Sequence, residues 1–500
     1  MFMKSFDVII IGGGVVGCMT ARALSRYDLK VLLIEKNVDI GMGASCANSA
    51  IIHAGHDPIP GTLKARMNKI GNPMWDRLSL ELGIPLKHTG AYIVAVNDEE
   101  LSCLTDLKQR AMENGIRAEL ISAEEMRNRE PKVNPAVTGA LFTPTAGLID
   151  PFAACIAPLE NAIENGVQVM VETAFEDFIL ENKTIKGIHT SRGDFACRWV
   201  VNAAGVYSDE VMHKAGVRPG FKITPRKGEY FVLDQSEFEM QNVLFPVPSA
   251  VSKGTVVVGS THGNALVGPT STVSPDPEDT AVTGAGLSEI WQSALRLVPS
   301  LNQRAVIAVF GGTRATGNAT CTASGVDYHH DFIIEVPEEV RGFVNIGGIE
   351  SPGLTAAPAI AERVIELLLE AGEPLQQKEN WNPIRKPRAR FSHLSHAEQK
   401  ALGDADPAFR RIICRCEMVT EGEILAEIHS PLPATTYDAI KRRTWLGTGR
   451  CLGAFDMPRV VEILARELGI SPLEVTKRGG SSTLLERLTK DVEEQDDPQG

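Results

Sequence analysis

The first forty residues alternate apolar runs with short polar or glycine-rich breaks. The run V-I-I-I follows an acid and enters G-G-G-V-V-G within Phe6–Gly17, and a segment bearing alanine and leucine leads to K-V-L-L-I-E-K at Lys30–Lys36. The apolar runs predict buried strands and the segment between them predicts a helix, so the order is strand, tight turn, helix, strand. The acid before the first run and the glycines inside it exclude a signal peptide or a membrane span here.

The turn after the first predicted strand has the spacing of a dinucleotide-binding fingerprint. Gly12, Gly14 and Gly17 stand where such a site needs a tight turn, a close approach of backbone to pyrophosphate, and close packing of helix on strand. The N-terminus of the following helix would hold the phosphates by its N–H groups and dipole. Glu35 ends the second strand, where its carboxylate can accept from both hydroxyls of a ribose, and we expect Lys36, the next residue, to belong to the cofactor site as well. This pattern predicts a bound dinucleotide rather than a plain glycine-rich turn.

Three later segments indicate which dinucleotide is bound. They are G-A-S-C-A-N-S-A-I-I-H-A-G at Gly43–Gly55, W-V-V-N-A-A-G-V-Y-S-D at Trp199–Asp209, and F-V-N-I-G-G-I-E-S-P-G-L-T-A-A-P-A-I-A at Phe343–Ala361. Each alone fits a packed turn between strand and helix. Together, in this order, they resemble the D-amino-acid oxidase superfamily of flavoproteins over roughly residues 5–370, which implies FAD rather than NAD as cofactor. The resemblance implies FAD-binding roles for Ser45, Asn48, Ser49, Ala204, Gly205, Gly348, Gly353, Leu354 and Thr355.

The predicted fold class is α/β, with a Rossmann-like FAD-binding domain interleaved with an antiparallel-sheet α+β substrate domain. The nucleotide motifs stand at both ends of a span that contains alternating strands such as G-E-Y-F-V-L and a hairpin around T-H-G-N. The two domains therefore cannot follow one another in sequence. We expect the oxidoreductase to span 1–370, its FAD-binding parts at about 1–80, 145–215 and 325–370, and its substrate domain at about 81–144 and 216–324.

Catalytic candidates follow from the same resemblance. His53, in I-I-H-A-G, matches a histidine beside the isoalloxazine in relatives, where an imidazole can act as base near neutral pH; a structural histidine is the alternative. Arg314, in F-G-G-T-R-A, matches an arginine that holds the substrate's anionic group, because its rigid fork suits a two-oxygen anion; a surface ion pair is the alternative. His262 is a weaker candidate, since a hairpin turn favours polar residues for its geometry alone.

The composition changes after about residue 370. Residues 371–411 are polar, proline-bearing and basic, as expected of a linker. Cys414 and Cys416 then flank one arginine, and Cys451 follows after thirty-four intervening residues. This spacing resembles the bacterioferritin-associated-ferredoxin type of [2Fe–2S] domain, which we expect at 412–480, before an acidic, disordered tail at 481–500.

The expected fourth cysteine of that domain is replaced by Asp456, with four residues between it and Cys451. A carboxylate is a hard donor that ferric iron accepts, and non-cysteine ligands at one iron have a precedent in Rieske centres. We therefore predict Cys414, Cys416, Cys451 and Asp456 as cluster ligands. A zinc site and an empty, vestigial module are the alternatives.

Charge and cysteine usage narrow the class of protein. The 500 residues carry a formal net charge of −13, which favours solubility and argues against nucleic acid as a partner. The nine cysteines are an odd number, and six lie far apart with no disulfide-like rhythm, so we expect these six to be reduced thiols. These six are Cys18, Cys46, Cys103, Cys155, Cys197 and Cys321. Because the apolar run near the N-terminus predicts neither a signal peptide nor a membrane span, we expect a cytoplasmic chain.

These features predict an FAD-dependent dehydrogenase that oxidises a small anionic alcohol. The resemblance implies glycerol 3-phosphate or a 2-hydroxy acid such as L-2-hydroxyglutarate as substrate, with electrons passing through the cluster to a second redox subunit. Any association with a membrane would be peripheral and run through that partner. The alternatives are a dehydrogenase for an amine or imino acid, such as proline or hydroxyproline, and a non-catalytic protein that only transfers electrons.

Overall fold

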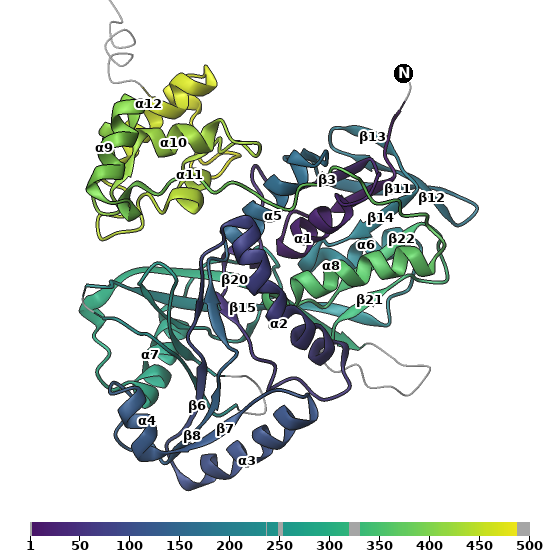
Figure 1. The fold of residues 1–500 in the computed structure, drawn as a ribbon. Coiled ribbons are helices and arrows are strands. Elements are labelled where there is room, and N and C mark those ends of the chain that lie inside the picture. Colours follow the sequence, from purple (N-terminus) through teal and green to yellow (C-terminus); the bar gives the residue numbers. More distant parts are fainter. Residues whose placement is uncertain (1–2, 237, 249–253, 320–330, 488–500) are drawn as a thin grey trace, which may run out of the picture. The chain divides into compact units, whose positions relative to one another are not determined.

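The computed structural model describes residues 3–236, 238–248, 254–319 and 331–487, and the chain divides into two compact units (Figure 1). Unit 1 comprises Met1–Lys36 and Ile40–Arg385, and unit 2 comprises Asn37–Asp39 and Lys386–Gly500. The boundary after Arg385 falls inside the segment predicted as a linker, 371–411. Cys321 and the end of the acidic tail lie outside the described residues.

A six-stranded sheet forms the nucleotide-binding core of unit 1. Its parallel strands are paired in the order β10, β3, β2, β14 and β22, and β21 is antiparallel at the edge. The V-I-I-I and V-L-L-I runs are buried along their whole length, as strands covered on both faces must be. The strands are β2 (Val8–Ile11), β3 (Val31–Ile34), β10 (Gln168–Met170), β14 (Trp199–Asn202), β21 (Ile333–Glu335) and β22 (Phe343–Gly347).

Helices pack against this sheet and against one another. Helix α8 (Gly353–Glu370) contacts both α1 (Val15–Leu24) and α2 (Leu63–Leu82), and Figure 1 shows α1 and α8 side by side. Helix α5 (Ala153–Glu164) packs on α1, and α6 (Ser208–Lys214) follows β14. A four-stranded sheet lies in the order β1 (Lys4–Ser5), β13 (Gly193–Ala196), β12 (Thr184–Thr190) and β11 (Phe175–Glu181).

The second large sheet of unit 1 has nine strands among the described residues and is antiparallel except for the pair β16 and β6, which is parallel. Its longest pair joins β15 (Phe221–Leu233) to β20 (Val306–Ala319). These strands come from chain segments that lie between strands of the six-stranded sheet, so the predicted interleaving is confirmed. The other strands are β6 (Ala91–Ala95), β7 (Glu119–Ser122), β8 (Gly139–Thr143), β16 (Val243–Pro246), β17 (Val256–Gly259), β18 (Ala265–Gly268) and β19 (Thr272–Val273).

Helices α3 (Asp98–Glu113), α4 (Ala123–Arg129) and α7 (Gly284–Leu297) belong to this part of unit 1 (Figure 1). Ile290, Trp291 and Ala294 of α7 are buried in one cluster with residues of the sheet, such as Phe231 and Val257. A small sheet consists of β4 (Ile51–Ile52), β9 (Gly147–Ile149) and β5 (Leu86–His88). The pairing of β4 with β9 fixes the backbone just before His53.

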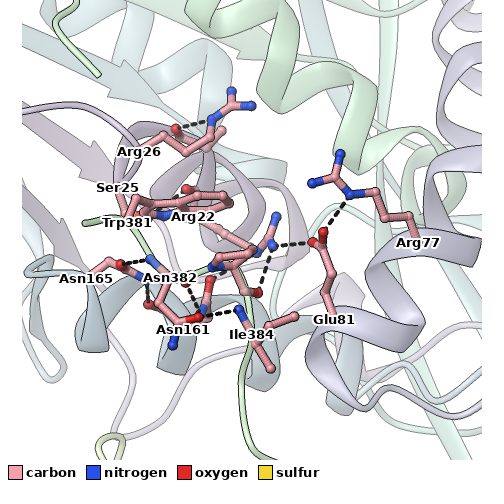
Figure 2. A network of polar contacts seen from close by, with 12 residues as sticks. Arg22, Ser25, Arg26, Arg77, Glu81, Asn161, Asn165, Trp381, Asn382 and Ile384 are labelled. Carbon is pink, nitrogen blue, oxygen red and sulfur yellow. Dashed lines mark hydrogen bonds and ion pairs between the residues drawn. The ribbon is translucent and has the colours of Figure 1, made fainter. Parts of the chain in front are cut away.

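The chain segment that follows α8, expected to be a linker, is bound to the rest of unit 1 by a network of hydrogen bonds (Figure 2). Arg22 of α1 donates to Glu81 at 2.6 Å and to the carbonyl of Pro383 at 3.2 Å. The indole N–H of Trp381 donates to Ser25 Oγ at 3.1 Å, and the backbone N–H of Asn382 donates to Asn165 Oδ1 at 2.9 Å. These bonds fix the segment up to the boundary after Arg385.

Unit 2 is a small helical domain with its own apolar core. It contains α9 (His396–Ala405), the hairpin of β23 (Ile412–Cys414) and β24 (Val419–Thr420), α10 (Glu421–Ile428), α11 (Tyr437–Thr444) and α12 (Met457–Leu468). Asp39 is buried against Arg442 and Arg443, with contacts of 2.6 and 2.8 Å. Burial opposes the ionisation of Asp39, but the two guanidinium groups outweigh it and hold the pKa of this carboxyl at about 2. None of the helices in the described part of the chain is both long and apolar enough to cross a membrane.

Candidate functional site

The glycine turn after β2 is shaped by two close backbone approaches. Gly12 has φ +106°, and a Cβ on it would lie 2.5 Å from the carbonyl oxygen of Ala203. A Cβ on Gly17 would lie 2.0 Å from the carbonyl oxygen of Gly12, so helix and turn touch as the fingerprint requires. A Cβ on Gly14 would meet only Ser45 Oγ within 4 Å, at 3.3 Å, among the residues that the structure describes. Gly14 therefore leaves room for the close approach of pyrophosphate that the fingerprint predicts.

Two predicted side chains meet this turn. Glu35 accepts from the backbone N–H of Gly13 at 2.8 Å, and Ser45 accepts from the backbone N–H of Val15 at 2.9 Å. The first contact fixes the carboxylate at the end of β3, and the second joins the 43–55 loop to the start of α1. Lys36 is paired with Glu278 at 2.5 Å and lies 4.1 Å from the ring centre of Tyr207.

The other predicted FAD-binding residues lie in the turns that surround this core. Asn48 closes its own loop, donating to the Ser45 carbonyl at 2.9 Å and accepting from Ala50 at 2.7 Å. Ser49 donates to Tyr230 Oη at 3.3 Å. Ala204 and Gly205 begin the turn after β14, Gly348 follows β22 with φ +67°, and Gly353, Leu354 and Thr355 form the first turn of α8.

His53 is positioned by residues from three parts of the chain. Its backbone N–H donates to Thr355 Oγ1 at 2.9 Å, and its carbonyl accepts from the amide of Asn68 at 3.1 Å. Its Nε2 lies 3.2 Å from Ser351 Oγ. The imidazole is therefore directed toward the segment that joins β22 to α8.

Arg314 reaches the same segment from β20. Its Nη2 donates to the carbonyl of Thr270 at 2.8 Å, whereas its buried Nε has no hydrogen-bond partner among the described residues. Glu350 lies near it and accepts from Lys64 at 2.9 Å and Thr316 at 2.7 Å. Burial opposes the ionisation of Glu350, but Lys64, Thr316 and Arg314 outweigh it and lower its pKa. Glu350 lies near Arg314, and the next residue, Ser351, contacts His53. The structure therefore brings the surroundings of Arg314 and His53 together.

The surroundings of Arg314 also include Tyr230, which the sequence did not single out. Burial raises the pKa of Tyr230, although Arg314 and Ser49 act in the opposite direction, so its hydroxyl stays protonated. Nothing in the alternating pattern of G-E-Y-F-V-L distinguishes this position from its neighbours.

Ser351 was also missed, although it lies inside the segment quoted for FAD. His262 lies in the turn between β17 and β18, and its catalytic role stays a prediction.

The predicted metal ligands of unit 2 lie in two pairs. Cys416 Sγ and Cys451 Sγ are 3.7 Å apart, close to the roughly 3.8 Å expected for two sulfurs bound tetrahedrally to one metal at about 2.3 Å. Cys414 is buried and its sulfur accepts from the Gly447 N–H at 3.5 Å; burial, with nearby Asp456 contributing, raises the pKa of its thiol to about 12. In the described ranges no three His, Cys, Asp or Glu side chains converge on one metal ion. Two pairs fit a two-iron cluster better than a single zinc ion.

Asp456 completes the second pair. It is 1% exposed, its Oδ1 accepts from the Tyr437 hydroxyl at 2.6 Å, and its buried Oδ2 has no hydrogen-bond partner in the part of the chain that is described. Burial, with Asp456 adding to it, raises the pKa of Tyr437, so the tyrosine is the proton donor of this bond. An unpartnered buried carboxylate oxygen beside Cys414 fits a metal ligand.

A parallel sheet with a dinucleotide turn, interleaved with a second, mostly antiparallel sheet, is the architecture of a class of FAD-dependent oxidoreductases. Residues 7–367 match the family described as FAD dependent oxidoreductase, and residues 412–466 match the BFD-like [2Fe-2S] binding domain. The chain belongs to this FAD dependent oxidoreductase family and carries a [2Fe–2S] domain after it.

Individual relatives match most of the chain. The glycerol 3-phosphate dehydrogenase of Caloramator mitchellensis is 41% identical over 488 residues, which are 97% of this chain and 99% of the relative. One subunit of the anaerobic glycerol-3-phosphate dehydrogenase of Escherichia coli (strain K12) is 26% identical over 491 residues, 93% of this chain and 88% of the relative. The structure of dithionite-reduced L-alpha-glycerophosphate oxidase from Mycoplasma pneumoniae with FAD bound has a TM-score of 0.71 at 35% identity, covering 77% of this chain and 100% of its own. The predicted family, cofactors and fold are confirmed.

Proposed function

We propose that this chain is a glycerol 3-phosphate dehydrogenase that passes electrons from FAD through its [2Fe–2S] cluster to a partner redox protein. The observation that carries the proposal is the buried Nε of Arg314, which has no hydrogen-bond partner among the described residues. Arg314 acts on the charge of Glu350, whose neighbour Ser351 contacts His53. A phosphate or carboxylate is the group that such a guanidinium binds best. The relative that matches almost the whole chain is itself named a glycerol 3-phosphate dehydrogenase, which favours phosphate.

Each side chain has a defined task in this proposal. Arg314 binds the phosphate and so places the carbinol beside His53. Ser351 Oγ, 3.2 Å from His53 Nε2, orients the imidazole until the substrate hydroxyl replaces it at that nitrogen, and Nε2 then takes the hydroxyl proton. Tyr230 adds a hydroxyl donor near Arg314. FAD, when bound, accepts the hydride from the carbinol carbon. Gly12, Gly14 and Gly17 with Glu35 and Ser45 would hold its pyrophosphate and ribose.

The cluster domain supports a dehydrogenase rather than an oxidase. The match to the glycerophosphate oxidase structure covers 100% of the oxidase but only 77% of this chain. The unmatched part of this chain is comparable in size with unit 2. The dehydrogenase relatives match 97% and 93% of this chain. An oxidase can give its electrons to dioxygen at the flavin, whereas a one-electron cluster serves a protein acceptor.

Glycerol 3-phosphate is expected to bleach the flavin of the purified chain in the absence of oxygen. The measurement is the loss of flavin absorbance in a stopped-flow experiment, with L-2-hydroxyglutarate, L-proline and glycerol as comparison substrates. The His53→Gln variant should keep FAD and be bleached about 100-fold or more slowly, because it lacks the base. Bleaching by L-2-hydroxyglutarate or L-proline alone would reassign the substrate, and bleaching by none of them would favour an electron-transfer protein.

Removal of the Asp456 carboxylate should release the cluster without affecting the flavin half-reaction. Asp456→Ala is expected to lose iron and its reduced-state paramagnetic resonance signal, while Asp456→Cys keeps the cluster at a different midpoint potential because thiolate donates more electron density than carboxylate. Cys103→Ala, at an exposed thiol of α3, serves as the control that should change neither property. The measurement is iron and sulfide analysis of anaerobically prepared protein. Full iron in Asp456→Ala would remove Asp456 from the ligand set, whereas stoichiometric zinc in the wild type would rule out the cluster and the electron relay.

A further inference from the structure

Tyr437 directs its hydroxyl at the predicted ligand Asp456 inside the core of unit 2. The residue opens α11, is 2% exposed, and donates to Asp456 Oδ1 at 2.6 Å. The two oxygens of the carboxylate are therefore unequal. Oδ1 is held by the tyrosine, and Oδ2 is buried without a hydrogen-bond partner among the described residues.

The slot for the hydroxyl is formed by two glycines of the cysteine-bearing loop. A Cβ on Gly447 would lie 2.4 Å from Tyr437 Oη, and a Cβ on Gly453 would lie 2.2 Å from the same atom. Both glycines have positive φ, +70° and +86°, which L side chains rarely adopt. Any side chain at either position would displace the hydroxyl. The loop therefore leaves space for the hydroxyl group of Tyr437 and not only for its aromatic ring.

The same loop contacts the sulfur ligands. The N–H of Gly447 donates to Cys414 Sγ at 3.5 Å, and Gly453 lies between Cys451 and Asp456 in the chain. The hydroxyl of Tyr437 is therefore packed into the segment that carries the predicted ligands, and its hydrogen bond with Asp456 connects α11 to them.

We propose that Tyr437 is a positioning residue for the iron–sulfur cluster: it holds Oδ1 of Asp456 so that this residue ligates iron through Oδ2 alone. The proposal rests on the proposed ligation by Asp456. A carboxylate can bind a metal through one oxygen or two, and a hydrogen bond to one oxygen selects the first mode. The same bond withdraws electron density from the carboxylate, so the reduced cluster is favoured and the midpoint potential is higher than it would be without the hydroxyl.

The Tyr437→Phe variant of the full chain tests this, because it keeps the ring and removes only the hydroxyl. We expect a correctly folded variant, checked by circular dichroism, that still contains iron and sulfide. Its midpoint potential should be lower, its reduced-state resonance signal shifted, and its iron should pass to a chelator about 10-fold faster or more, as for other lost partners of metal ligands.

The same change in an Asp456→Cys background supplies the matched control. A cysteine has no second oxygen for the tyrosine to hold, so Tyr437→Phe should there have little effect on the potential or on iron release. Equal effects in both backgrounds would show that the hydroxyl only supports packing and would overturn the proposal. So would a Tyr437→Phe variant indistinguishable from an iron-containing wild type. Wild type prepared without iron would instead be a failure of the proposed ligation itself.

Discussion

The Gly14→Val variant is expected to fold and to be purified without FAD. Gly14 has φ −73° and ψ 176°, an extended conformation that valine adopts readily, so the backbone gains no strain. A Cβ at this position meets only Ser45 Oγ, at 3.3 Å, among the described residues, and we expect the two methyl groups beyond it to occupy the space assigned to the pyrophosphate. We expect flavin absorbance to be absent, glycerol 3-phosphate oxidation to be abolished, and the secondary structure by circular dichroism to be retained.

Two further glycines separate loss of cofactor from loss of fold. Gly284→Val, at the start of α7, is the control, since a Cβ there has no described atom within 4 Å, and it should keep FAD and activity. Gly17→Val should instead impair folding itself, because its Cβ would lie 2.0 Å from the carbonyl oxygen of Gly12. A yellow, fully loaded Gly14→Val protein would contradict the assignment of this turn to FAD.

Arg314→Lys is expected to weaken the use of glycerol 3-phosphate while leaving the flavin spectrum unchanged. Lysine keeps the charge but lacks the planar fork, and a charge-assisted hydrogen bond contributes about 1.5–3 kcal/mol, so kcat/KM should fall about 10- to 100-fold, mainly through KM. Oxidation of glycerol, which has no phosphate, should be slow in both proteins and nearly equal. The measurement is steady-state kinetics with an artificial electron acceptor on both substrates.

Arg226→Lys provides a matched control in the same sheet. Arg226 lies directly opposite Arg314 in the register of β15 and β20, but its guanidinium already donates to Ser271 Oγ at 3.1 Å and to the Ser271 carbonyl at 3.2 Å. This variant should retain near-normal KM. An Arg314→Lys protein with unchanged KM would show that the phosphate is bound elsewhere. A similar rise of KM in both variants would indicate that replacing either arginine disturbs the sheet itself.

The sequence alone determined the parts of this protein whose chemistry is local. A tight turn needs glycine at fixed offsets, and a buried strand needs an uninterrupted apolar run, so the spacing of Gly12, Gly14, Gly17 and Glu35 was enough to place them around β2, α1 and β3. Likewise, the cluster domain is marked by cysteines at short spacing, and the replacement of one by Asp456 is visible in the order of residues. The family resemblance added the order of three distant segments and hence the interleaving of the two domains.

Only the tertiary structure decided which distant residues share a site. Tyr230 belongs with Arg314 because β15 and β20 are paired, and Ser351 belongs with His53 because the turn after β22 returns to β4. Tyr437 precedes Asp456 by nineteen residues, a separation that carries no periodic signal, and their contact exists because the first residue of α11 packs against the loop before α12. Periodicity reports which face of an element is buried, but it cannot report what that face touches, because pairing and packing between remote segments depend on the whole fold.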